Sequence, residues 1–411
     1  MAIDVDLLFH PVGQGLFASG HIKRSGSNQT NFSWIYDCGS LSGGHLEIGG
    51  INRLAAHMGG SRPPIDLLVI SHFDHDHISG IPHLLTTFDV KQILLPLVPL
   101  WSRLSVIARL GHSVTALEQA LILDPVGTLS GLPEGVSPDE IVIVPAQDGS
   151  EGPPALDPRE TPEDHDFTLH IDRNDLEENS AGSFGYSLSD KDSSVQVSML
   201  IKSGRLAVGN VWEFVPYNDA HSIGKASPKF VQDAEILANF LYAASSERAR
   251  SQILSLTKLH YEAHFKGSQA RNQLSLFLYG GASPKLRRTG AAFNGWRNLY
   301  PSNCPKEDLR GVLYTGDGTL RTAKAWKQLH TFFGSQRLSQ LTAIQVMHHG
   351  SRYNWRAGLA GKIAAETAIF AADPNFRHRH PHGEVWDDFA ASSTAILVDT
   401  RFPCHLTQRF A

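Results

Sequence analysis

The sequence predicts a layered α/β fold, and two observations carry this prediction. Short apolar runs bounded by glycine, proline or polar residues recur near both ends of the chain, as buried strands do. Segments with apolar residues at helical spacing lie between many of these runs. Strands and helices that alternate in this way build sheets covered by helices, so two such blocks predict an α/β sandwich.

The first block begins with short predicted strands that glycine-containing turns connect. A helix leads from them to an apolar strand, and a second helix and a further strand follow. The expected strands are 3–9, 15–22, 32–36, 65–70 and 90–95, and the expected helices are 46–58 and 81–88.

A second strand-rich block mirrors the first near the end of the chain. Apolar runs again end at glycine, proline or polar clusters, and helical segments fit between them. The expected strands are 273–279, 311–314, 342–347, 367–370 and 395–398, and the expected helices are 322–333, 356–363 and 383–390.

The segment between the two blocks has a different composition. Residues 130–192 are rich in proline, glycine, serine and acidic residues, which is typical of a long, partly irregular insertion. Predicted strands at 196–202 and 205–215 and a helical stretch at 230–265 follow it. We therefore divide the chain into the first half of the sandwich (1–129), an acidic insertion followed by strands and helices (130–270), and the second half (271–411).

Length and composition exclude several classes of protein. With 411 residues and 41% hydrophobic content, the chain can bury a large core. No apolar run approaches the ~20 residues that a membrane helix needs, and the first residues lack a signal-peptide pattern. Three widely spaced cysteines favour neither a disulfide framework nor a thiolate zinc site. We expect a cytoplasmic protein that does not bind membranes.

The charge is distributed unevenly. Sixteen acidic and three basic residues lie between 134 and 192, so the rest of the chain carries a net charge of +8 although the total is −5. A basic body suits a polyanionic substrate, and the acidic segment alone is equally explained as a loop that keeps the protein in solution.

Segment 71–80, with the sequence SHFDHDHISG, is the most informative part of the chain. It follows a predicted buried strand and holds three imidazoles and two carboxylates within six residues. Such crowded ligands would repel one another at a strand end unless a cation held them together. The segment therefore predicts a metal site, and an ordinary polar loop is the competing interpretation.

Polar side chains also follow three strands of the second block. Asp317 comes after the strand 311–314, His348 and His349 after 342–347, and a histidine-rich segment, 378–382, after 367–370. The carboxyl ends of strands in α/β sheets are where loops converge on one crevice, so we expect all four loops to meet. Arg377 precedes the last segment and Arg379 lies within it, so a solvated basic loop is the alternative for it.

This set of motifs resembles the metallo-β-lactamase fold of hydrolases, whose first motif is His-x-His-x-Asp-His. The motif here is His72-x-Asp74-x-Asp76-His77, with Asp in place of the second His. That variant resembles the nuclease-like domain of the competence protein ComEC, as do the segments 12–15, 35–39 and 272–276. The resemblance covers about 3–125 and 270–400, and it implies a metallo-β-lactamase-type αββα sandwich with a mixed α/β insertion.

The resemblance also implies a role for each candidate residue. His72 and Asp74 would bind one metal ion, and Asp76 and His77 the other. The residue expected to bridge both ions is Asp317, and His349 would complete the ligand set. His348 and His380 are candidates for three roles: the remaining ligand, a contact with the substrate phosphate, or proton donation.

Two features of the ligand set stay open. The isolated His that usually follows the first motif has no evident counterpart, and Asn272 or Ser275 would occupy that space. Asp in place of His makes the site richer in oxygen, so Mn²⁺ competes with Zn²⁺, the first choice, for both positions. Asp37 is expected to support the ligands through hydrogen bonds.

We predict that the chain is a hydrolase of phosphodiester bonds that uses a metal-activated bridging hydroxide, with Asp76, Asp317, His348 and His380 at the reacting centre. A nuclease acting on DNA or RNA is favoured because the second block contains basic residues, namely Lys285, Arg287, Arg288, Arg297 and Arg310. The alternatives are a hydrolase of cyclic nucleotides, phosphocholine or lactones, and a metal-binding interaction module without catalysis. A nucleic acid or nucleotide is the expected partner, and the sequence does not indicate protein partners or an oligomeric state.

Overall fold

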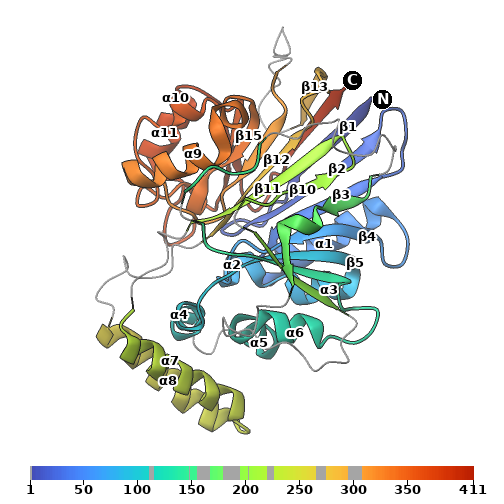
Figure 1. Ribbon diagram of the computed structural model, residues 1–411. Coiled ribbons are helices and arrows are strands. Elements are labelled where there is room, and N and C mark those ends of the chain that lie inside the picture. Colours follow the sequence, from blue (N-terminus) through green and yellow to red (C-terminus); the bar gives the residue numbers. More distant parts are fainter. Residues whose placement is uncertain are drawn as a thin grey trace.

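The computed structural model describes residues 2–110, 115–147, 149–154, 167–178, 195–201, 203–219, 226–264, 275–294 and 308–411. Within these ranges, eighteen strands form two sheets, and helices lie on the outer side of each sheet (Figure 1). The two sheets pack face to face around a shared apolar layer. This arrangement confirms the predicted αββα sandwich.

The first sheet contains the strands of the N-terminal block and both ends of the chain. Its order is β13 (Arg288–Asn294), β18 (Cys404–Phe410), β1 (Ile3–Phe9), β2 (Phe17–Arg24), β3 (Phe32–Cys38), β4 (Pro64–Val69), β5 (Asp89–Pro96), β6 (Glu140–Val144), β9 (Gln196–Leu200) and β8 (Leu176–Glu178). The strands from β13 to β3 are antiparallel to their neighbours, and those from β3 to β9 are parallel. The parallel strands therefore end on the same edge.

The second sheet is built in the same way. Its order is β17 (Thr394–Val398), β16 (Thr367–Ala371), β15 (Leu341–Gln345), β14 (Gly311–Tyr314), β12 (Leu276–Ala282), β11 (Trp212–Asn218), β10 (Leu206–Val208) and β7 (Leu169–Ile171). The strands from β14 to β17 run parallel to one another. Loops after β14, β15 and β16 therefore leave the sheet on one side.

Alternation along the strands explains why the sheets pack together. In β1, Ile3, Val5 and Leu7 are fully buried in the layer between the sheets, while Asp4 and Asp6 point to the other face. Aromatic side chains fill the centre of that layer: the rings of Tyr36 and Tyr314, one from each sheet, stack with centroids 4.8 Å apart.

Helices cover the two outer faces. The first sheet is covered by α1 (Gly44–Met58) and α3 (Ile81–Thr87), with α4 (Leu100–Leu110), α5 (Ala116–Leu123) and α6 (Pro125–Ser130) beyond them. The second sheet is covered by α9 (Ala323–Ser339), α10 (Ala360–Ile363) and α11 (Gly383–Ala390). The helix α11 has the predicted bounds, α9 extends further than predicted, and α10 is only the last turn of the predicted helix.

The segment 130–270 contributes strands to both sheets. Strands β6, β8 and β9 belong to the first sheet, and β7, β10 and β11 belong to the second. The single strand predicted at 205–215 is a hairpin instead, because Gly209 has a φ of 48° and turns the chain between β10 and β11. Much of the acidic stretch, residues 155–166 and 179–194, lies outside the described residues.

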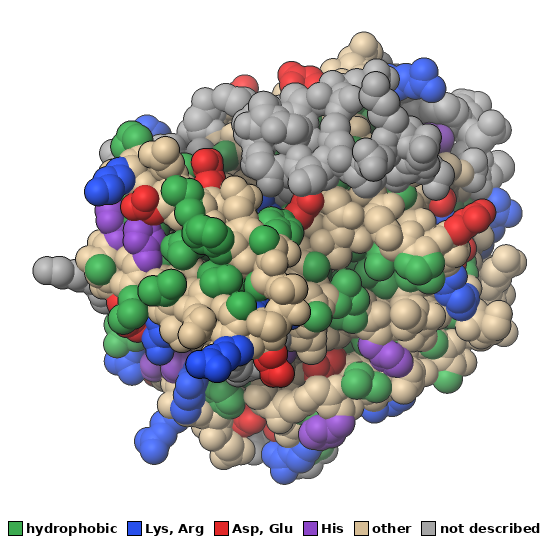
Figure 2. Space-filling model, turned by 90° about the horizontal axis from the view of Figure 1, so that it is seen from below, with side chains coloured by type: hydrophobic (Ala, Val, Ile, Leu, Met, Phe, Trp, Pro, Cys, Tyr) green, Lys and Arg blue, Asp and Glu red, His purple; other side chains and the backbone are tan. Residues whose placement is uncertain are grey.

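The helical stretch predicted at 230–265 forms two helices, α7 (Pro228–Ala243) and α8 (Glu247–His264), which make a hairpin against α4 (Figure 1). Figure 2 shows the molecule from below, the side on which this hairpin lies in Figure 1, with several hydrophobic side chains at the surface. The exposed large hydrophobic residues of the hairpin are Ile236, Phe240, Tyr242, Leu256 and Leu259. In the described part of the chain, no helix has the length and apolar character needed to cross a membrane.

A buried ion pair joins the second sheet to its helices, and we expect its loss to destabilise the fold. Glu213 on β11 and Arg337 on α9 are 4% and 6% exposed, and Arg337 Nε donates to Glu213 Oε1 at 2.8 Å. Removing one partner leaves a charge buried without compensation. Glu213→Ala should lower the free energy of unfolding by about 3–5 kcal/mol in urea titration.

The matched control for this prediction is Glu384→Ala, which breaks the exposed pair of Glu384 with Arg352. Exposed pairs contribute about 0–1 kcal/mol, so the control should unfold close to the wild type. Equal effects of the two substitutions would contradict the assignment of the Glu213–Arg337 pair as a structural element.

Candidate metal centre

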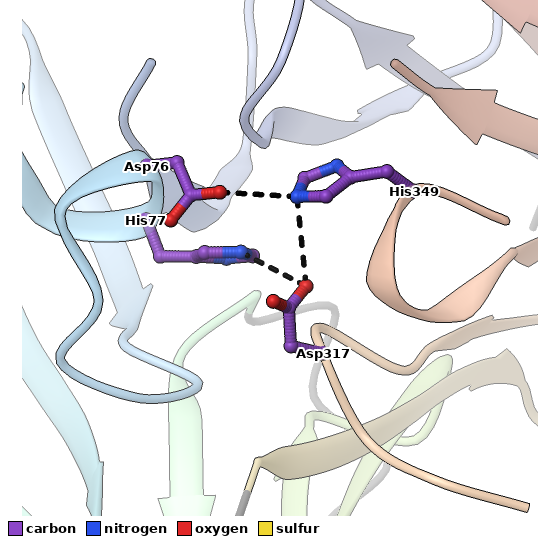
Figure 3. A group of neighbouring side chains, drawn as sticks. All are labelled: Asp76, His77, Asp317 and His349. Atoms are coloured by element: carbon purple, nitrogen blue, oxygen red, sulfur yellow. Dashed lines mark hydrogen bonds and ion pairs between the residues drawn. The ribbon is translucent and has the colours of Figure 1, made fainter. Parts of the chain in front are cut away.

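Three loops bring four side chains together at the carboxyl ends of strands from both sheets. The loop after β4 leads into the single-turn helix α2 (His75–Ile78), which carries Asp76 and His77. The loop after β14 carries Asp317, and the turn Met347–Gly350 after β15 carries His349. Figure 3 shows these four side chains directed at one another. The expectation that loops distant in sequence converge here is therefore met by the geometry.

Asp317 lies at the centre of the cluster, and its two oxygens face different neighbours. Oδ1 is 3.1 Å from His77 Nε2 and 3.7 Å from His349 Nε2. Oδ2 is 3.8 Å from His72 Nε2 and 3.5 Å from His348 Nδ1. A carboxylate with imidazoles on both sides has the geometry that the predicted bridging role requires.

The opposite side of the cluster is formed by Asp76 and His349. The Nδ1 atom of His349 donates to the carbonyl oxygen of Ala371 at 2.7 Å, so its Nε2 carries the free lone pair of the neutral ring. That Nε2 atom lies 3.1 Å from Asp76 Oδ2. Two acceptors this close repel each other unless a proton or a metal ion lies between them.

The same argument applies to His77, which is fully buried. Its Nδ1 donates to Asp37 Oδ2 at 2.8 Å, so Nε2 again presents its lone pair to Asp317. Asp37 is also fully buried and accepts hydrogen bonds from the backbone N–H and the hydroxyl of Ser71 at 2.7 and 2.6 Å. Asp37 thus fixes the orientation of the His77 ring from the side opposite the cluster.

The pKa directions agree with this electrostatic picture. Burial alone would lower the pKa of His77, but the carboxylates of Asp317 and Asp37 raise it well above its usual value. Burial would raise the pKa of Asp317, yet the neighbouring imidazoles hold it well below the usual range. The pKa of His349 is likewise raised by the nearby carboxylates against the effect of burial.

One buried atom tests whether a cation fits this donor set. His72 is only 3% exposed, and its buried Nε2 atom has no hydrogen-bond partner among the described residues. The other ring nitrogen, Nδ1, lies 2.9 Å from the hydroxyl of Ser71. An unpartnered nitrogen that faces a carboxylate, beside other imidazole and carboxylate donors, suits a divalent metal ion.

Side-chain donors close enough to share an ion form two groups within the described part of the chain. The first contains Asp76, His77, Asp317 and His349, and the second contains Asp37, His72 and His77. In the second group the oxygens of Asp37 are already engaged by Ser71 and His77. The first group is therefore the better preformed metal site, and His72 extends it on the far side of Asp317.

Asp74, predicted to bind a metal with His72, lies outside both groups. Its Oδ1 accepts a hydrogen bond from Arg109 Nη2 of α4 at 2.5 Å. Because Asp74 is bound to Arg109, the metal position expected beside His72 has fewer donors than the sequence predicts. Nothing in the spacing around Arg109 marks this residue, because a lone arginine on an amphipathic helix is ordinary.

The remaining histidines border the centre. His348 is partly exposed beside Asp317, and His380 is 5% exposed and stacks on His349 with ring centroids 6.1 Å apart. Burial, followed by the neighbouring imidazoles, lowers the pKa of His380 to about 3. The ring of His378 is next to that of His380, whereas His382 accepts a hydrogen bond from the backbone of Arg352.

Gln14 is a residue whose role the sequence did not predict, although it lies in the quoted segment 12–15. Its side chain is 2% exposed, and its Nε2 donates to His380 Nδ1 at 3.4 Å. Ser275 approaches His72 Nδ1 at 3.5 Å and accepts from the backbone N–H of Asp317. Ser275 therefore supports the centre by hydrogen bonding, and Asn272 lies outside the described residues.

Three residues of the centre have backbone strain. Asp37, His348 and His349 have φ values of 56°, 47° and 57°, a region that residues other than glycine rarely adopt. Such a conformation costs on the order of 1 kcal/mol or more and persists where surrounding contacts fix it. The backbone near Asp37 is closely packed, because a Cβ atom at Gly39 would lie 2.5 Å from the backbone of Asp76.

The αββα sandwich with His and Asp side chains at its strand ends is consistent with the metallo-β-lactamase fold. Residues 35–172 match the family model described as the metallo-beta-lactamase superfamily, a region that includes Asp37 and the segment 72–77. The match and the cluster together support a metal-dependent hydrolase. Neither identifies the metal.

The chain is also similar to the crystal structure of the metallo-beta-lactamase fold protein YhfI from Bacillus subtilis. The two are 10% identical, the alignment covers 98% of this chain and 100% of that one, and the TM-score is 0.34. A comparison with curated proteins found no match.

Proposed function

We propose that this protein is a metal-dependent phosphodiesterase that acts as a nuclease. The observation that carries the proposal is the position of Asp317, whose two oxygens face separate sets of donors at 3.1–3.8 Å. A shared carboxylate of this kind is the usual feature of two-metal sites in phosphatases and nucleases. When bound, a pair of divalent ions supplies Lewis acidity toward a phosphoryl oxygen and lowers the pKa of water.

The chain's own residues provide the rest of the chemistry. The amide of Gln14 donates to His380 Nδ1, which places the ring proton of neutral His380 on Nε2. That N–H can donate to an oxygen of the substrate. The partly exposed His348 lies between Asp317 and solvent, where an incoming phosphate would contact it. Both positions are consistent with substrate contacts.

The basic residues of the second block support the nuclease proposal less than the sequence suggested. Arg288 is fully buried and bound to Glu366, and Arg310 is buried and donates to backbone carbonyls. Lys285 and Arg287 are exposed, and Arg297 lies outside the described residues. Cations near the centre are better placed: Arg109 reaches Asp74, and the exposed Arg352 adjoins His382.

The test is an assay of the purified protein against single- and double-stranded DNA, RNA and cyclic nucleotides, with Zn²⁺ or Mn²⁺ added. We expect cleavage of at least one nucleic acid, its loss with a chelator, and its return when metal is restored. Asp317→Ala protein is the control for contaminating nucleases. Activity on cyclic nucleotides alone would favour the small-molecule alternative, and cleavage of a lactone or choline ester alone would contradict a phosphodiesterase.

A further inference from the structure

A large cavity lies on the outer face of the first sheet, and we call it the outer-face cavity. Its volume is about 1280 Å³, above the ~300–1,000 Å³ that is usual for small-molecule sites. The floor is the polar side of β18, β1, β2 and β3, and the walls are α1 and the loops 28–31 and 400–403. Its lining includes none of the candidate metal ligands, so it is separate from the metal centre.

The buried imidazole of His21 marks this cavity as unusual. His21 lies on β2, lines the cavity and is 7% exposed, yet neither of its ring nitrogens has a hydrogen-bond partner among the described residues. Asp6 is directly opposite in the strand register, but its carboxylate is taken up by Lys23 at 2.9 Å and Thr407 at 2.6 Å. Buried polar groups in native proteins are rarely left unpartnered, so a ligand would explain this one.

The wall opposite His21 presents cationic and imidazole groups. His45, Arg53 and His57 lie at eight- and four-residue spacing, on one face of α1, and all three line the cavity and are exposed. Within the described ranges, Arg53 and His57 have no ion pair or side-chain hydrogen bond. These donors are therefore free to meet an anion.

Both carboxylates of the lining have partners within the protein. Asp6 is neutralised by Lys23, and Asp66 accepts from the backbone N–H and the hydroxyl of Ser33 at 2.7 and 3.0 Å. Burial, opposed by the charge of Asp6 and assisted by those of His57 and Lys23, lowers the pKa of His21 to about 4.

We propose that the outer-face cavity binds a phosphorylated organic molecule of about nucleotide size. Donors from α1 and β2 approach from two sides, which suits a tetrahedral oxyanion. Apolar side chains of the same lining, Leu46, Leu54, Met58 and Pro63, provide a surface for the organic part. The proposal does not depend on the reaction at the metal centre.

The test is isothermal titration of the protein with adenosine 5′-monophosphate and with inorganic phosphate. Asp317→Ala protein is titrated beside the wild type, because binding at the metal centre would differ between them. We expect saturable binding of the nucleotide with equal affinity in both proteins. Arg53→Ala should weaken it by about tenfold or more, whereas Arg248→Ala, an exposed arginine of α8, should leave it unchanged.

His21→Leu separates a ligand contact from a structural role. Because leucine removes an unpartnered polar group without opening a large void, the unliganded variant should melt at or above the wild-type temperature. It should also lose the rise in melting temperature that the nucleotide gives the wild type. A lower melting temperature without ligand would assign His21 to the fold and overturn the proposal.

Three further results would overturn it. They are the absence of saturable binding at millimolar nucleotide, unchanged affinity in Arg53→Ala and His21→Leu, and loss of binding in Asp317→Ala. If a single-stranded oligonucleotide bound the cavity as tightly as the mononucleotide, the cavity would be part of a nucleic-acid binding surface. That result would also contradict a small-molecule site.

Discussion

Asp317→Ala is expected to lose both metal and activity. The substitution removes the one carboxylate that faces His77 and His349 on one side and His72 and His348 on the other. Without it, His77 and His349 lose the oxygen that lies between them, and His72 loses the carboxylate that it faces. Turnover of the phosphodiester substrate should fall on the order of 10³-fold or more, which corresponds to ~4 kcal/mol of transition-state stabilisation.

The measurement combines elemental analysis of the purified variant with its rate on the best substrate of the panel. Asp387→Ala is a matched control, because Asp387 is an exposed carboxylate on α11. The control should keep wild-type metal content and rate. An Asp317→Ala protein that retains the full metal content of the wild type would show that this carboxylate is not a ligand.

Asp37→Asn should weaken metal binding without unfolding the protein. Asp37 Oδ1 accepts from the backbone N–H of Ser71, so the amide oxygen must occupy that position. The amide NH₂ then faces Nδ1 of His77, which has to become an acceptor. The proton of the neutral ring moves to Nε2, the atom that faces Asp317, and the lone pair that would bind a metal is lost.

Loss of a hydrogen bond that orients a metal-binding histidine costs about 10–100-fold in metal affinity, and a reversed tautomer should fall at the upper end of that range. Competition with a chelator of known affinity measures the change. Asp37→Ala is the contrasting variant: it leaves the N–H of Ser71 buried without a partner and should also lower the free energy of unfolding by about 1–3 kcal/mol. Wild-type affinity in Asp37→Asn would contradict the orienting role.

The layered fold and the convergence of loops could be predicted from sequence because both follow from local patterns. Alternating apolar residues mark β1, and a polar cluster after an apolar run marks the end of β4 and of β15. Parallel strands then bring such ends to one edge whatever the distance along the chain. Asp76, His77, Asp317 and His349 therefore come together as expected.

Other parts depend on contacts that sequence patterns do not encode. The engagement of Asp74 by Arg109 requires the position of α4, which is set by packing against α7 and α8. The assignment of strands within 130–270 to both sheets depends on long-range pairing rather than on composition. Arg288 is one of the basic residues that favour a nucleic acid in the sequence, and only the structure shows that it is buried and paired with Glu366.

Anomalous X-ray diffraction from crystals grown with Zn²⁺ or Mn²⁺ tests the central claim most directly. The account predicts two anomalous peaks, one on each side of the Asp317 carboxylate, with His349 and Asp76 beside one of them and His72 beside the other. Peaks elsewhere in the molecule, or none at this cluster in metal-soaked crystals, would contradict it.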